Sequence, residues 1–225
     1  MTRQELMRFL KLSQFPPVEK ADQDGLLCFG GELEPKIMID AYIHGIFPWP
    51  HEGYPLLWFF PYERGVLDFK DLHVSKTLQK LIRKDLYEFR FNTCFDQVIE
   101  HCSRVPRKGQ KGTWITPKMK SAYLKLFEMN LVLSVECFRK DSGKLVGGLY
   151  GVLLANVMSG ESMFGLEDNV SKLCVIETVR LLKERGLDWM DIQMVTPVME
   201  SLGGKLVSRS EYIERLKRAH KTYGL

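Results

Sequence analysis

The chain has 225 residues, of which 45% are hydrophobic and 27% are charged, and its formal net charge is +4. This size and composition predict one large or two small globular domains and argue against a disordered chain. The N-terminus lacks the apolar segment of a secretory signal, and no apolar run approaches the roughly 18 residues that a membrane span needs, so we expect a soluble, cytoplasmic protein.

The first sixty residues differ in character from the rest. Seven of the ten prolines occur by Pro61, together with turns such as Phe15-Pro16-Pro17 and Gly30-Gly31. A helix is expected from about Pro35 to His44, because proline suits the first helical position and Gly45 can end the helix. We therefore expect a small, loop-rich N-terminal domain over residues 1–62.

Downstream of residue 62, the hydrophobic period changes along the chain. A period near 3.6 residues predicts helices at about 74–82, 95–102, 115–127, 170–185 and 210–221. A period of two predicts strands at about 131–139, 144–154, 156–164 and 187–194. This order of elements predicts an α+β (α/β) fold, with helices packed on a sheet, over residues 63–225.

Neither the cysteines nor the histidines are spaced like metal ligands. The five cysteines form no CxxC pair, and the five histidines show no HExxH or similar spacing. Scattered cysteines in a chain without an export signal are usually buried thiols in a reducing cytosol. We expect no metal site.

The glycine-rich segments give no sign of nucleotide binding. Gly147-Gly148-Leu149-Tyr150-Gly151 does not fit GxGxxG, and GxxxxGK[ST] does not occur in the sequence. Small residues here either let a ligand or another backbone approach closely or allow tight packing against a helix.

One short motif resembles part of a nucleophile elbow. In Gly160-Glu161-Ser162-Met163-Phe164, Phe164 takes the place of the last glycine of GxSxG, and no histidine can be assigned to Ser162. Short matches of this kind arise often by chance. The motif therefore argues only weakly for a serine hydrolase.

A second motif places two polar side chains together. On a strand, Asp191 and Gln193 share one face, and unpaired burial of such groups costs about 1–3 kcal/mol. They belong either to a hydrogen-bonded pair in the core or to an edge strand, or they form a carboxylate that orients an amide, which in turn positions a reacting amine.

Basic residues fall into three groups. Such groups either neutralise nucleic-acid phosphates or form solvated surfaces. The groups are Lys76, Lys80, Arg83 and Lys84 in a predicted helix, Arg104, Arg107, Lys108 and Lys111 in a loop, and Arg215, Lys217, Arg218 and Lys221 in the last helix.

An ordered series of short blocks runs from about Phe15 to Leu216. The blocks are Asp24-Gly25-Leu26-Leu27, Gly30-Gly31-Glu32-Leu33, Ala41-Tyr42-Ile43-His44-Gly45-Ile46-Phe47-Pro48-Trp49, His73-Val74-Ser75-Lys76, Gly112-Thr113-Trp114-Ile115, Ser134-Val135-Glu136, Leu145 to Gly151, Gly160 to Phe164, Ser171-Lys172 and Ser201-Leu202-Gly203. In this order they resemble the leucyl/phenylalanyl-tRNA–protein transferase family, the bacterial aminoacyltransferases of the N-end rule pathway.

The resemblance implies an acetyltransferase-like (GNAT-type) domain over residues 63–225. It also implies that the chain transfers Leu or Phe from aminoacyl-tRNA to the N-terminal residue of acceptor proteins, Lys or Arg by default, and so marks them for degradation. No cofactor is implied, because the ester of the aminoacyl-tRNA is already activated. Aminoacyl-tRNA and acceptor proteins are the expected partners, with no membrane, and we expect a monomer.

The resemblance also carries roles over to particular residues. Asp191 and Gln193 match a catalytic pair, in which Gln193 holds the attacking amine and Asp191 orients Gln193. Glu161 matches a residue at the acceptor's amino end, and Trp49 and Trp114 match aromatic residues around the terminal adenosine of tRNA. The remaining matches are the apolar pocket for the aminoacyl side chain, at Tyr42, Tyr123, Leu149, Met158, Met163 and Met190, and the tRNA-facing cations Lys76, Lys80, Arg83 and Lys84.

The chain departs from the family pattern at several positions. Gly165 replaces a serine, Met158 a phenylalanine of the pocket, and Thr196 and Val198 an Asn and a His. The family's W-W-S-P-D-P-R reads Trp58-Phe59-Phe60-Pro61-Tyr62-Glu63-Arg64. Acidic acceptor N-termini stay open as an alternative, as do an acyltransferase that uses acyl-CoA on the same fold and a non-catalytic tRNA-binding protein.

Overall fold

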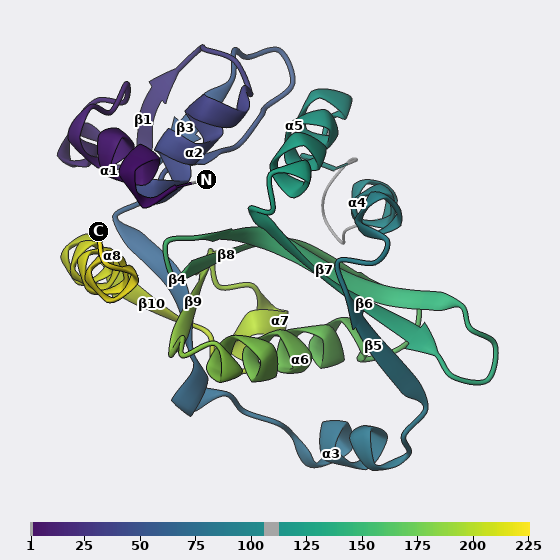
Figure 1. The fold of residues 1–225 in the computed structure, drawn as a ribbon. Coiled ribbons are helices and arrows are strands. Elements are labelled where there is room, and N and C mark those ends of the chain that lie inside the picture. Colours follow the sequence, from purple (N-terminus) through teal and green to yellow (C-terminus); the bar gives the residue numbers. More distant parts are fainter. Residues whose placement is uncertain (1, 106–112) are drawn as a thin grey trace.

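The protein is described by a computed structural model over residues 2–105 and 113–225 (Figure 1). Arg107, Lys108 and Lys111 of the second basic group, and Gly112 of one family block, lie outside the described residues. No helix within the described ranges combines the length and apolar composition that a bilayer span requires.

The N-terminal part of the chain contains a small antiparallel sheet and two α-helices. The strand order of the sheet is β1-β3-β2. Its elements are α1 (Arg3–Lys11), a 3-10 turn (Val18–Lys20), β1 (Leu26–Phe29), α2 (Pro35–Ile43), β2 (Phe47–Pro48) and β3 (Leu57–Phe59). The helix expected from Pro35 is confirmed, whereas α1 and the three strands were not predicted, so this region has more regular structure than expected.

The rest of the chain is built on a seven-stranded sheet of order β10-β4-β9-β8-β7-β6-β5. Neighbouring strands are antiparallel except for β8 and β9, which run parallel. The strands are β4 (Glu63–Asp68), β5 (Tyr87–Phe91), β6 (Val132–Arg139), β7 (Leu145–Leu154), β8 (Val157–Gly165), β9 (Trp189–Gln193) and β10 (Lys205–Ser208).

Helices cover both faces of this sheet, which confirms the predicted α+β class. In Figure 1, α4 and α5 lie on the same side as the N-terminal part, whereas α6, α7 and α3 lie on the other side. The helices are α3 (Lys76–Arg83), α4 (Phe95–Arg104), α5 (Pro117–Glu128), α6 (Val170–Glu184), α7 (Pro197–Glu200) and α8 (Arg209–Tyr223). All five helices and all four strands expected after residue 62 are present; β4, β5, β10 and α7 are additional.

The glycines of β7 serve packing. A Cβ on Gly147 would lie 2.3 Å from Val170 Cγ1 of α6, whereas one on Gly148 would lie 2.7 Å from the Phe164 ring and 3.0 Å from Val98 of α4. Because neighbouring residues of a strand point to opposite faces, each glycine lets a different helix approach the sheet. Both interpretations of Gly147–Gly151 are confirmed in part: Gly147 and Gly148 allow helix packing, whereas a Cβ on Gly151 would lie 2.2 Å from the backbone oxygen of Ser159, so Gly151 lets another strand approach closely.

The hydrophobic core has two parts, one on each face of the large sheet. The larger cluster joins the N-terminal helices to α4, α5 and α8, and the smaller cluster lies beneath α6. The predicted buried thiols are confirmed for Cys102, Cys137 and Cys174, and the other two cysteines are half-buried. The α4 side of the sheet and the N-terminal part therefore share one core.

Candidate active site

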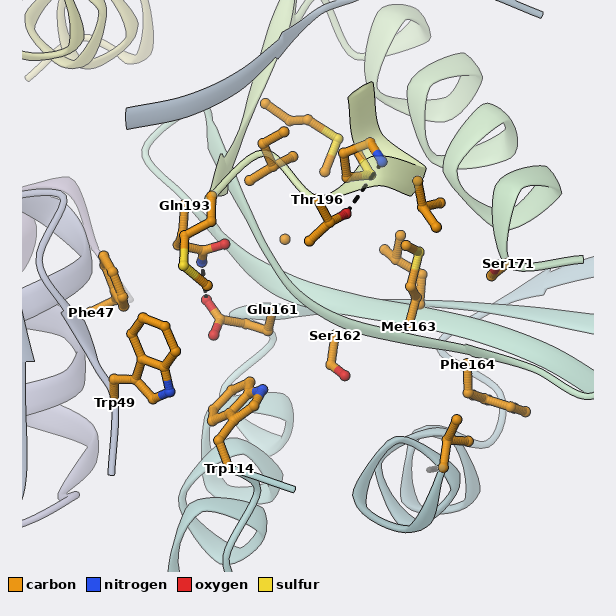
Figure 2. A pocket seen from close by; sticks show the side chains of 18 of the residues that line it. Phe47, Trp49, Trp114, Glu161, Ser162, Met163, Phe164, Ser171, Gln193 and Thr196 are labelled. Atoms are coloured by element: carbon orange, nitrogen blue, oxygen red, sulfur yellow. Dashed lines mark hydrogen bonds between the residues drawn. The ribbon is translucent and has the colours of Figure 1, made fainter. Parts of the chain in front are cut away.

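The parallel strands β8 and β9 separate and open a cavity. They pair at Ser159 and Asp191. Beyond that pair, the residues that follow on each strand become opposite walls of a cavity of about 560 Å³. The remaining walls come from the β2 segment of the N-terminal part, from residues next to α4 and α5, and from β7, α6 and α7 (Figure 2). The lining residues are Phe47, Pro48, Trp49, Val105, Trp114, Leu149, Gly160 to Gly165, Ser171, Met190, Ile192, Gln193, Met194, Thr196, Val198 and Met199.

A chain of hydrogen bonds begins at the cavity wall and continues into the core. The Gln193 amide Nε2 donates to Glu161 Oε1 at 2.9 Å, as Figure 2 shows, and the Tyr123 hydroxyl donates to Glu161 Oε2 at 2.8 Å. The Tyr42 and Tyr123 hydroxyls are 2.8 Å apart. Because Tyr123 gives its proton to Glu161, its oxygen accepts from Tyr42.

The pKa of Glu161 lies close to neutral pH. Burial, partly opposed by the hydrogen bond from Tyr123, raises the pKa of Glu161 to about 7. Burial also raises the pKa of the Tyr42 and Tyr123 hydroxyls well above their usual value, so both stay neutral donors. A carboxylate at the wall of a cavity with a pKa near 7 is suited to accept a proton from a substrate.

Asp191 lies behind this chain in a fully buried ion pair. The Arg64 Nε and Nη2 atoms donate to the two Asp191 carboxylate oxygens at 2.8 and 2.6 Å, and the exposed fractions of the two side chains are 2% and 0%. Tyr212 also donates to Asp191 Oδ2 at 2.9 Å. Burial alone would lower the pKa of Arg64, but the charge of Asp191, its hydrogen bond and the neighbouring Tyr212 and Glu161 together outweigh burial and raise the pKa, so the guanidinium stays charged.

The guanidinium of Arg64 is held by aromatic rings from both ends of the chain. Its central carbon lies 4.6 Å from the centroid of the Phe47 ring and 4.6 Å from that of the Tyr212 ring. Contacts of this kind add cation–π attraction to the ion pair. The position of Asp191 therefore depends on β2, β4 and α8 together.

Asp191 acts on Gln193 through the backbone. Its Oδ1 accepts the Gln193 backbone N–H at 2.9 Å, whereas the Gln193 side-chain amide donates to Glu161. The expected direct orientation of the amide by Asp191 is thus replaced by an indirect one. Gln193 has φ +53, a left-handed conformation that a residue with a side chain rarely adopts, and the bond to Asp191 helps to hold it.

The structure distributes the expected aminoacyl-pocket residues between the cavity wall and the layer beneath it. Leu149, Met163 and Met190 line the cavity. Tyr42 and Tyr123 lie behind Glu161, and Met158 is fully buried, so none of these three is among the lining residues.

Other expected residues also lie at the cavity. Trp49 and Trp114 lie beside Glu161 in Figure 2, whereas Ser171 and Phe164 mark the far end. The divergent positions Gly165, Thr196 and Val198 line the cavity as well.

The basic helix α3 is separate from the cavity. None of Lys76, Lys80, Arg83 and Lys84 lines it, and Figure 1 places α3 beyond α6, on the opposite side of the sheet from α4 and α5. All four cations are exposed. Within the described ranges, the salt bridges involve none of them.

Sequence reasoning assigned no role to Arg64, Tyr212 or Phe47. Arg64 is the last residue of the divergent family block, and this was the only sequence signal for it. Its partner Asp191 is 127 residues away along the chain. Tyr212 belongs to the apolar stripe of α8, whose residues read as ordinary core.

Comparisons with known proteins point to one family. A family profile described as leucyl/phenylalanyl-tRNA protein transferase matches residues 66–217, and the profile of that family's N-terminal domain matches residues 31–61. Proteins named leucyl/phenylalanyl-tRNA–protein transferase are 44% identical over 205 residues in Maridesulfovibrio salexigens and 42% identical over 205 residues in Christiangramia forsetii. These alignments cover 91% and 90% of this chain, and 85% and 96% of the relatives.

Solved structures give weaker likenesses. A PaiA N-acetyltransferase from Thermoplasma acidophilum, in complex with coenzyme A, aligns over 45% of this chain and 74% of its own, with a TM-score of 0.33 and 15% identity. A glucosamine N-acetyltransferase region of a fungal β-N-acetylglucosaminidase aligns over 65% of this chain and 20% of its own, with a TM-score of 0.44 and 12% identity. Likenesses at this level carry no conclusion about function.

Proposed function

Because the chain belongs to the leucyl/phenylalanyl-tRNA protein transferase family, and is therefore an aminoacyltransferase, we propose that it transfers Leu or Phe from aminoacyl-tRNA to proteins with an N-terminal Lys or Arg. The observation that carries this proposal is the Gln193–Glu161 hydrogen bond at the wall of a largely apolar cavity. It places a hydrogen-bond acceptor and a proton acceptor next to a space suited to an apolar aminoacyl group.

Gln193 positions the acceptor amine. An ionised Glu161 carboxylate only accepts hydrogen bonds, so the Gln193 Nε2 must face it, and this leaves Gln193 Oε1 as an acceptor for the amine. Asp191, locked by Arg64, holds the backbone of Gln193 in place. Fixing the amine against the ester is the main contribution that such a site makes to the rate.

Glu161 takes the proton that the acceptor must lose. An N-terminal ammonium cannot attack until it gives up one proton, and a carboxylate with a pKa of about 7 accepts it at neutral pH. The neutral amine then attacks the ester carbonyl carbon. The new C–N bond forms, the C–O bond to the ribose breaks, and the second proton of the amine passes to the ribose oxygen.

The donor lies along the apolar side of the cavity. Leu149, Met163 and Met190 surround its side chain, and flexible methionines suit a pocket that takes both aliphatic and aromatic groups. Trp49 and Trp114 lie at the terminal adenosine, where stacking on a base contributes about 1–3 kcal/mol. No cofactor takes part, because the ester supplies the activation.

The tRNA and the cellular setting complete the proposal. Lys76, Lys80, Arg83 and Lys84 of α3 contact tRNA phosphates, which their exposure and lack of carboxylate partners within the described ranges support. We place the chain in the cytoplasm, as a monomer in the N-end rule pathway. Residues 1–62 and 63–225 form its two domains: each holds one of the two sheets, and the two pack against each other through the larger core cluster.

A direct transfer assay tests the proposal. The protein is incubated with radiolabelled Leu-tRNA or Phe-tRNA and with peptides that differ only in an N-terminal Lys, Arg, Asp or Glu. We expect label in the Lys and Arg peptides, and little label when Gln193→Ala is used. Binding of tRNA without label in any peptide would refute the enzyme and favour a tRNA-binding protein, and label from an acyl-CoA donor instead would favour the acyltransferase alternative.

A further inference from the structure

The N-terminal part supplies one member of the hydrogen-bonded chain that ends at the cavity. Tyr42 lies in α2, whereas Tyr123 and Glu161 lie in α5 and β8. The Tyr42 and Tyr123 hydroxyl oxygens are 2.8 Å apart, and Tyr123 donates to Glu161 Oε2 at 2.8 Å. One hydroxyl therefore links the N-terminal part to the carboxylate that is proposed to accept the proton of the substrate.

Both tyrosines are enclosed by protein. The exposed fractions of Tyr42 and Tyr123 are 4% and 0%. The Tyr123 ring packs edge-on against Trp114 and Tyr150, with centroid distances of 6.4 and 5.3 Å. Because a phenol hydroxyl is a rigid extension of its ring, this packing fixes where the Tyr123 oxygen lies. A buried hydroxyl that loses its partner in such surroundings is destabilising, so both bonds of the chain persist.

The charge of Glu161 sets the direction of the bonds in the chain. An ionised carboxylate accepts and does not donate, so Tyr123 gives its one proton to Glu161. The Tyr123 oxygen is then an acceptor, and Tyr42 supplies the proton for that bond. Gln193 Nε2 donates to the other carboxylate oxygen, which leaves Gln193 Oε1 for the amine. The chain thus runs in one direction, from α2 to the amide that is proposed to hold the substrate.

Several charged and titratable groups face Glu161. Burial has the largest effect and raises the pKa of Glu161, whereas the hydrogen bond from Tyr123 and the Tyr42 hydroxyl behind it lower the pKa. Smaller effects come from the Asp191 charge of β9, which raises the pKa, and from the Arg64 charge of β4, which lowers it. The two tyrosines are therefore the main groups that favour the ionised carboxylate. Further polar groups near the chain are Gln193 of β9, Tyr150 of β7 and Tyr212 of α8.

We propose that Tyr42 is a positioning residue of the transfer reaction, which acts through Tyr123 to direct the hydrogen bonds that Glu161 and Gln193 make at the cavity. The inference rests on the proposed function, in which Glu161 accepts the proton of the acceptor amine. Without the Tyr42 hydroxyl, the Tyr123 oxygen loses its donor, and Tyr123 becomes a weaker donor itself, because hydrogen bonds in a chain strengthen one another. Glu161 then keeps its own proton up to a higher pH.

Phenylalanine variants test the chain one hydroxyl at a time, since each keeps its ring. Transfer of label from Leu-tRNA to one peptide with an N-terminal Lys is measured from pH 5.5 to pH 9, so the ionisation of the peptide is common to all proteins. We expect the pH at which kcat reaches half its maximum to rise by about 0.5 in Tyr42→Phe and by about 1–2 in Tyr123→Phe, which loses the direct bond. The double variant should shift by less than the sum, because Tyr42 acts through Tyr123. Tyr54→Phe removes an exposed hydroxyl of the N-terminal part and should leave the profile unchanged.

Stability gives a second measurement that does not depend on transfer. The free energy of unfolding of Glu161→Gln, relative to its parent, rises with pH until the pH passes the pKa of Glu161 in the folded parent. When both proteins of the pair also carry Tyr42→Phe, we expect this rise to continue to a pH about 0.5 higher. Urea unfolding at several pH values measures the two curves.

The outcomes distinguish this inference from the proposed function. An unchanged profile in Tyr42→Phe, additive shifts in the double variant, or an equal shift in Tyr54→Phe would each overturn the role of Tyr42 while transfer persists. A wild-type protein that labels no peptide would refute the transferase itself, and the unfolding curves would then decide whether Tyr42 acts on Glu161. If Tyr42→Phe does not fold, 3-fluorotyrosine at position 42 replaces it: this residue keeps the hydroxyl and makes it a stronger donor, so the profile should move to lower pH, and an unchanged profile would overturn the proposal.

Discussion

Replacing Glu161 by glutamine removes a carboxylate whose charge destabilises the folded protein at neutral and higher pH. Burial raises the pKa of Glu161 to about 7 from its usual 4.5, so the folded state binds this proton more tightly than the unfolded chain does. The stability that the group contributes is therefore complete below pH 4.5 and is lost as the pH rises through 7. At about 1.4 kcal/mol per pKa unit, the loss above pH 7 is about 3 kcal/mol.

A neutral glutamine at position 161 does not ionise, so the variant does not lose this stability as the pH rises. Its size and shape match those of Glu161, and it still offers an oxygen to Gln193. We expect the free energy of unfolding of Glu161→Gln, relative to wild type, to rise by about 2 kcal/mol between pH 5.5 and pH 8. Urea unfolding at several pH values measures this difference, and Glu128→Gln, at an exposed position of α5, is the matched control.

Activity should change in the opposite direction. If Glu161 accepts the proton of the acceptor amine, the wild-type rate rises with pH up to about 7, and the variant loses that rise and about 10²-fold in kcat at pH 8. If the stability difference between variant and wild type were the same at every pH, the conclusion that the Glu161 carboxylate ionises near pH 7 would be refuted. An unchanged pH–rate profile would instead refute its role as proton acceptor.

Three further outcomes follow from the site. Tyr212→Phe removes one hydrogen bond to Asp191 and should lower kcat for transfer while KM for Leu-tRNA stays constant; a change in KM alone would contradict a positioning role. Asp191→Ala would leave a buried guanidinium unpaired and lower the free energy of unfolding by about 3–5 kcal/mol, so Asp191→Asn is the better test of catalysis. We expect Asp191→Asn to fold, as measured by circular dichroism, and to transfer slowly. A normal transfer rate would exclude Asp191 from the mechanism. Lys80→Gln combined with Arg83→Gln should weaken tRNA binding and reduce the steepness of log association constant against log salt concentration by about 2, measured by filter binding. An unchanged slope would show that α3 is a solvated surface and not a tRNA contact.

Local pattern was enough to predict most of the large domain. The apolar stripes of α4, α5 and α6 show clearly in the sequence, and β6, β7 and β9 are buried on both faces and therefore show as runs rich in apolar residues. The β5 sequence Tyr87-Glu88-Phe89-Arg90-Phe91 also alternates aromatic and charged residues, which is typical of a strand with one exposed face. The strands β1 to β3 have four residues or fewer, too few for any period to be detected.

The sequence predicted the site residues that lie together on one segment, but not the contacts between residues of different segments. Asp191 and Gln193 stood out as polar residues in an apolar strand. Their actual relation, through the Gln193 backbone, depends on a left-handed residue at the strand end, and strand alternation does not describe such a residue. The arginine that fixes Asp191 comes from a different strand, and no local pattern links the two.

The Arg64 guanidinium explains why the N-terminal part matters to the chemistry. Its central carbon lies 4.6 Å from the centroids of the Phe47 and Tyr212 rings. Its nitrogens bind the Asp191 carboxylate, which in turn accepts the Gln193 backbone N–H. The β2 segment and the residue after it also place Phe47 and Trp49 at the wall of the cavity. A displacement of β2 would therefore disturb the donor space and the Asp191 ion pair at once, so transfer should be more sensitive than folding to substitutions at Phe47.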